Sequence, residues 1–142
     1  MLKTNSILLK VVLLASLLFS ILNLSSCSFT PEAFDSLDKT LKAYEKAIRW
    51  QDYKFARVFQ LKPVDISDFQ RQRLKSIRVT SYKVIHKVIA HDFSKTDIIV
   101  DIRYYQDSSA VERVLTDRQK WIYDAEADRW QLDSPFPDFK FH

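Results

Sequence analysis

The sequence contains no glycine. Loops that bind phosphate and the fingerprints that bind dinucleotides need glycine, because their backbone must approach the ligand without a Cβ atom in the way. The absence of glycine therefore excludes both kinds of nucleotide site. It also means that tight turns must be built from aspartate, serine, proline and lysine.

Cysteine is almost as scarce, because Cys27 is the only one in the chain. A single thiol allows no internal disulfide and no metal site made of thiolates. The three histidines, His86, His91 and His142, do not have the spacing of a zinc site, which needs three or four converging ligands. We therefore predict no metal and no bound cofactor.

An excess of charge of one sign is lacking too. The chain has 22 basic and 18 acidic residues, a net charge of +4. Lys3 and Lys10 belong to an N-terminal stretch without acidic residues, so the remainder has 20 basic residues against 18 acidic ones. Proteins that bind nucleic acid usually present a strongly basic face. The balance argues against a nucleic-acid partner.

The longest hydrophobic run extends from Val11 to Leu24, directly after the positive stretch that ends at Lys10. It has about 14 residues, fewer than the roughly 20 that a transmembrane helix needs. A positive head, a short apolar core and then small residues are typical of a secretory signal peptide. The alternative is an uncleaved anchor.

The residues Leu24-Ser25-Ser26-Cys27 follow this run and resemble the lipobox of bacterial lipoproteins. The resemblance implies recognition of Leu24, Ser25 and Ser26 by a signal peptidase, which removes residues 1–26. It also implies a covalent lipid, such as palmitate, on Cys27, and a short spacer over residues 27–30. An ordinary signal peptide with an incidental cysteine is the alternative.

The residue after the cysteine is Ser28. In Gram-negative lipoproteins an aspartate at this position commonly retains the protein in the inner membrane. The resemblance therefore implies a lipid-anchored protein on the periplasmic face of the outer membrane, with the membrane itself as one partner.

Apolar residues first recur at helical spacing and later alternate with polar ones. Thr30 and Pro31 predict the start of a long helix, and Asp52 predicts the cap of a second one. The alternation slips by one residue between Val79 and Tyr82, which predicts a β-bulge that bends the strand. We predict helices at 31–49 and 53–61, a short helical turn at 65–69, and strands at 77–88, 98–104, 111–124 and 129–132.

Helices followed by antiparallel strands predict a single α+β domain over residues 31–142. Three segments resemble the nuclear-transport-factor-2-like group of the cystatin-like superfamily, namely Trp50-Gln51-Asp52-Tyr53, Gln119-Lys120-Trp121 and Trp130-Gln131-Leu132. The resemblance implies a cone in which N-terminal helices pack on a curved antiparallel sheet, and a homodimer formed through the sheet. A plain cystatin-like sheet with one long helix is the alternative.

Four aromatic side chains with polar tips are expected to point into this cone and to line any pocket there: Tyr44, Trp50, Tyr82 and Tyr104. The aspartates of the strands, including Asp117, fall on the polar phase. No inward aspartate or glutamate is therefore expected to act as a base. His86 falls on the apolar phase of its strand but has no evident partner, and we predict no catalytic residue.

The C-terminal segment carries Phe136, Phe139 and Phe141. We expect these side chains to lie over the helices. The alternative is an exposed apolar patch that binds a partner protein.

The sequence therefore predicts a lipid-anchored lipoprotein with a non-enzymatic binding or scaffold domain for an envelope protein or a small apolar ligand. One alternative is a small isomerase- or hydrolase-like enzyme that uses the cone interior, as some members of the resembled group do. Another is an accessory subunit of an envelope assembly. A pocket with a buried ionisable group would favour the enzyme, and a filled interior would argue against it.

Overall fold

The structure is a computed structural model that describes residues 31–141. The predicted lipobox at residues 24–27 and the predicted spacer before Pro31 lie outside the described residues. Within the described range, three helices precede four strands. Their bounds are α2 Pro31–Arg49, α3 Tyr53–Val58, α4 Asp68–Lys75, β1 Ile77–Ile89, β2 Lys95–Gln106, β3 Ser109–Asp124 and β4 Arg129–Leu132.

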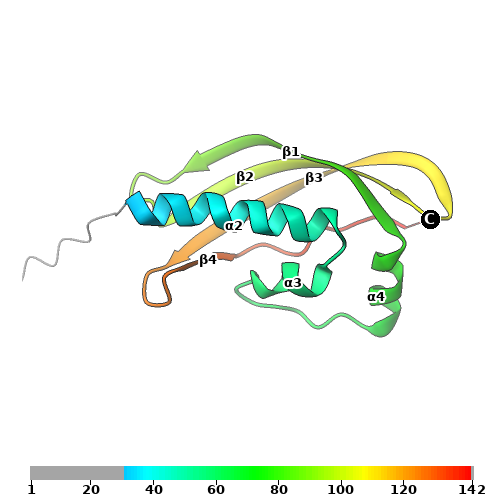
Figure 1. Cartoon of the computed structure of the whole chain (residues 1–142), viewed down its shortest axis with the longest axis horizontal. Coiled ribbons are helices and arrows are strands. Elements are labelled where there is room, and N and C mark those ends of the chain that lie inside the picture. Colours follow the sequence, from blue (N-terminus) through cyan, green and yellow to red (C-terminus); the bar gives the residue numbers. More distant parts are fainter. Residues whose placement is uncertain (1–30, 142) are drawn as a thin grey trace, which may run out of the picture.

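The four strands form one antiparallel sheet in the order β1-β2-β3-β4. The helices lie on one side of it, with α2 running along the sheet (Figure 1). The pairing of β1 with β2 shifts register between Val79 and Ser81 and again between Val84 and His86. These shifts confirm the predicted bulge and add a second one. The predicted α+β class is confirmed.

Helix α2 is amphipathic and buries one face against the sheet. Leu37, Tyr44 and Ile48 are almost fully buried, and the ring of Tyr44 meets that of Trp121 in β3 edge to face at 5.3 Å. Burial of an apolar side chain of this size stabilises the fold by about 1.5–3 kcal/mol. Phe34 lies on the same helical phase but is 43% exposed. Its ring faces Lys87 Nζ at 5.5 Å.

Helix α3 begins where the sequence predicts, because Asp52 accepts a hydrogen bond from the Phe55 amide at 3.0 Å and caps the first turn. It ends at Val58, and the prediction that it continues to residue 61 is wrong. The Leu61 amide donates to the Leu132 carbonyl at 2.9 Å, and the Leu132 amide donates to the Phe59 carbonyl at 2.7 Å. Pairing with β4 thus replaces the last helical turn.

The short helical turn predicted at residues 65–69 is wrong. The structure has a longer helix, α4, which begins at Asp68 and ends at Lys75. Ser67 and Gln70 form a capping box, in which each side chain bonds the backbone amide of the other residue, at 3.2 and 2.8 Å. The sequence signal was present, since a serine followed three residues later by glutamine is typical of this motif.

The C-terminal segment completes the core. Phe139 is buried, and its ring packs against the rings of Tyr104, at 5.0 Å, and Tyr53, at 6.2 Å. Phe136 also contacts Tyr53, at 5.7 Å, and Phe141 lies under the guanidinium of Arg73. The alternative of an exposed phenylalanine patch is therefore wrong for this segment. The described core extends from Leu37 to Phe139, so residues 28–142 contain it completely.

Candidate functional site

The interior under α2 is packed with aromatic rings. Tyr44 is fully buried between Trp121 and Phe59. Tyr104 is buried further along the sheet, where its hydroxyl accepts a hydrogen bond from the Lys140 amide at 3.0 Å. Two of the four aromatic side chains expected in the interior therefore fill it as core residues.

Trp50 does not point inward, and that prediction is wrong. Its side chain is 76% exposed. Trp50 lies one helical turn beyond Lys46, which is on the solvent face of α2, and its amide still donates to the Lys46 carbonyl at 3.0 Å. The helical phase therefore places the indole outside, where it borders a surface hollow of about 490 Å³ with Phe55.

A polar cluster lies beneath the aromatic layer, and the sequence analysis missed it. Gln119 Nε2 donates to Asp117 Oδ2 at 2.7 Å and to the Tyr82 hydroxyl at 2.9 Å. The Trp121 indole N–H donates to Gln119 Oε1 at 3.1 Å. Asp117 is only 9% exposed. The expectation that Asp117 lies on a polar face is therefore wrong, because β3 directs it to the same side as Gln119 and Trp121.

Burial controls the electrostatics of this cluster. It raises the pKa of Asp117, and the hydrogen bond from Gln119 offsets part of the rise. Burial also raises the pKa of Tyr82, against the lowering effect of the same glutamine. The pKa of Tyr44 is raised well above its usual value by burial and by the nearby Asp117 charge. A carboxyl group held in this way keeps its proton to a higher pH than an exposed aspartate does.

Access to the cluster is narrow. Tyr82 and Gln119 border a hollow of about 260 Å³ between α2 and β1. The α2 side of the hollow carries Asp38, Lys42 and Glu45. The volume is below the roughly 300–1,000 Å³ of small-molecule sites, so the cluster has an opening to solvent but little room for a substrate.

We expect Asp117→Asn to keep the fold and to make stability less dependent on pH. The folded pKa is raised above 3.8, so the folded protein binds a proton more readily than the unfolded chain. Wild-type stability therefore falls as pH rises from 3.8 through the folded pKa, whereas asparagine has no charge to bury. Urea unfolding from about pH 4 to pH 8 should show a flatter profile and a higher free energy of unfolding for the variant at neutral pH.

The exposed Asp97 on the opposite face of the sheet provides the matched control, as Asp97→Asn. It should retain the pH profile of the wild type. A wild-type profile in Asp117→Asn as well would contradict the assignment of a buried, perturbed carboxyl group.

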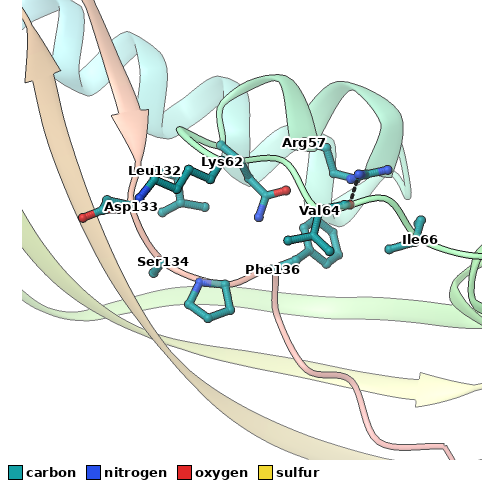
Figure 2. A pocket seen from close by; sticks show the side chains of 10 residues that line it. Arg57, Lys62, Val64, Ile66, Leu132, Asp133, Ser134 and Phe136 are labelled. Carbon is teal, nitrogen blue, oxygen red and sulfur yellow. Dashed lines mark hydrogen bonds between the residues drawn. The ribbon is translucent and has the colours of Figure 1, made fainter.

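A larger groove lies outside the core, between the connection from α3 to α4 and the C-terminal segment (Figure 2). Its volume is about 460 Å³. Figure 2 shows Val64 beside the ring of Phe136, with the Arg57 guanidinium donating a hydrogen bond to the Val64 carbonyl. Most of the wall is apolar. The side chains that form this apolar part are Val64, Ile66, Leu132, Pro135 and Phe136. Lys62 and Asp133 are among the polar residues that border it.

The two histidines among the described residues, His86 and His91, are exposed and do not contribute a site. The placement of His86 on the apolar phase of its strand is wrong, because the register shift after Val84 turns its side chain to the outer face. Within residues 31–141, no three histidine, cysteine or acidic side chains come together in a group that could hold a metal ion. The described helices also include none that is long and apolar enough to cross a membrane.

The fold and these sites define an α+β domain with a packed interior, a polar cluster around the buried Asp117, and an apolar groove on its surface. No protein-family model matches the chain, and the searches of curated proteins and of solved structures find no significant match.

Proposed function

We propose that the chain is a lipid-anchored lipoprotein of the cell envelope whose nuclear-transport-factor-2-like domain binds a small apolar ligand in the groove of Figure 2. Cys27 carries the lipid, and Ser28 directs the protein to the periplasmic face of the outer membrane. In this proposal the domain acts by binding and not by catalysis.

The sequence of the N-terminus supports the anchor. The positive head, the short apolar core and the lipobox follow one another in the order that lipoprotein export requires. Helix α2 begins at Pro31, only a few residues after Cys27. A lipid on Cys27 would therefore hold the domain close to the membrane surface.

The groove carries the binding part of the proposal. The aromatic interior leaves little space for a ligand, whereas the groove has the volume and the apolar lining of a small-molecule site. Its walls come from α3, the connection to α4 and the C-terminal segment, so the packed core fixes its shape.

We expect Val64→Lys to weaken ligand binding in the groove by about tenfold, because an apolar ligand in the groove would cover residue 64 and remove water from the ammonium group, at a cost of more than about 1.4 kcal/mol. Val64 is 72% exposed, so the change should leave the fold intact. Fluorescence of N-phenyl-1-naphthylamine, a neutral apolar probe, measures binding to residues 28–142. The control is Val58→Lys on α3, where the side chain is 67% exposed and does not line the groove. Equal losses of probe binding in both variants would mean that the probe binds outside the groove.

A small enzyme using the interior is the second candidate, because a buried carboxyl group lies beside the Tyr82 hydroxyl in the Asp117 cluster. The packing argues against this candidate, because Tyr44 and Trp121 are fully buried core residues and the hollow beside Tyr82 and Gln119 has only about 260 Å³. Hydrolysis of p-nitrophenyl butyrate that disappears in a folded Asp117→Asn variant would favour this candidate over the binding domain.

A further inference from the structure

A second pocket, of about 390 Å³, lies between α3 and α4 and borders the groove, because Arg57 and Ile66 line both. We call it the basic pocket. Four of its lining residues are basic, two from α3 and two from α4, namely Lys54, Arg57, Arg71 and Lys75. Two short helices thus direct cationic side chains toward one hollow.

These positive charges are only partly neutralised. Arg57 pairs with Asp65 at 3.8 Å, and Arg71 pairs with Asp68 at 3.0 Å, but both aspartates are almost fully exposed. Exposed pairs of this kind contribute little and exchange readily. Among residues 34–141, the Lys54 and Lys75 side chains form no ion pair.

One acidic residue, Asp52, also lines the basic pocket. Its carboxylate is used at the N-terminus of α3, where it accepts the hydrogen bond from the Phe55 amide. The basic pocket therefore keeps an excess of positive charge.

The remaining walls are apolar. Leu74 is buried, Ile66 is half-buried, and the ring of Tyr53 closes the side toward the core.

We propose that the basic pocket binds an anionic amphiphile, a molecule with one carboxylate or phosphate head on an apolar chain. The head lies among the four basic side chains, and the first part of the chain packs on Ile66 and Leu74. Charge complementarity selects the head, and the apolar floor distinguishes an amphiphile from a free inorganic anion. The basic pocket is separate from the groove, for which we propose a neutral ligand.

The experiment uses the full chain in phosphatidylcholine vesicles and an octanoate that carries a photoreactive diazirine at its chain end. Irradiation followed by mass spectrometry locates the cross-links. We expect them in the peptides of α3 and α4, with unlabelled octanoate as an effective competitor and with inorganic phosphate and 1-octanol as poor ones. The double variant Lys54→Gln with Lys75→Gln should lower the yield by about tenfold or more.

The matched control is Lys83→Gln with Lys95→Gln, which removes the same charge from exposed strand positions outside the pocket. Its cross-link yield should stay within about twofold of the wild type. Equal loss in both double variants, or cross-links spread along the chain, would overturn the site. Competition by phosphate as strong as that by octanoate would reassign it to a free anion, and equal competition by 1-octanol would remove any role of charge. None of these outcomes affects the neutral-probe experiment on the groove.

Discussion

Replacing Trp121 with alanine is expected to lower the free energy of unfolding by about 3–5 kcal/mol. The indole is fully buried in β3, and its ring contacts Tyr44 at 5.3 Å and Phe59 at 6.3 Å. Its N–H also donates to Gln119, so truncation leaves both a cavity and a buried acceptor without its donor. Domains of this size have a total stability of about 5–15 kcal/mol. Urea unfolding should therefore show a large shift of the midpoint.

Trp50 provides the matched control, because its side chain is 76% exposed. Trp50→Ala makes the same chemical change outside the core, and we expect its effect on the free energy of unfolding to stay within about 0.5 kcal/mol. Similar effects of the two substitutions would mean that the aromatic interior is not packed as described. The comparison thus tests the packing that argues against an interior active site.

Local signals predicted most of the fold. The start of α2 at Pro31 and the cap of α3 at Asp52 depend on residues adjacent to each helix. Alternation likewise located the strands, because one face of the sheet is buried under the helices. Local sequence signals could not predict where α3 ends. It is set by backbone pairing of residues 59–61 with Leu132, which is more than seventy residues away in the sequence.

The candidate site was less accessible to sequence reasoning, although one signal was available. Gln119 lies two residues before Trp121 in β3 and Asp117 lies four before it, so alternation from Trp121 directs both inward. The charge of Asp117 led to the prediction that it lies on the polar face, whereas hydrogen bonds within the cluster stabilise both side chains inside. The groove and the basic pocket had no such signal, since both are formed by packing of distant segments.

Replacing Cys27 with serine is expected to abolish lipid attachment. The serine hydroxyl cannot replace the thiol that accepts the lipid in the resembled lipoproteins. Burial of acyl methylenes contributes about 0.8 kcal/mol each, so two or more chains hold a protein on a bilayer stably and their loss releases it. In a bacterium with two membranes, radiolabelled palmitate should enter the wild-type chain and not Cys27→Ser.

Substitutions in the predicted lipobox provide the controls for this experiment. Ser25→Ala keeps a small residue at its position and should retain both the label and membrane fractionation, whereas a charge at Leu24, as in Leu24→Asp, should block processing. Ser28→Asp should stay labelled but move from the outer to the inner membrane, which separates anchoring from sorting. Palmitate incorporation into Cys27→Ser, or its absence from the wild type, would contradict the lipoprotein proposal. The α+β domain and its two surface sites would then have to act without a lipid anchor at Cys27.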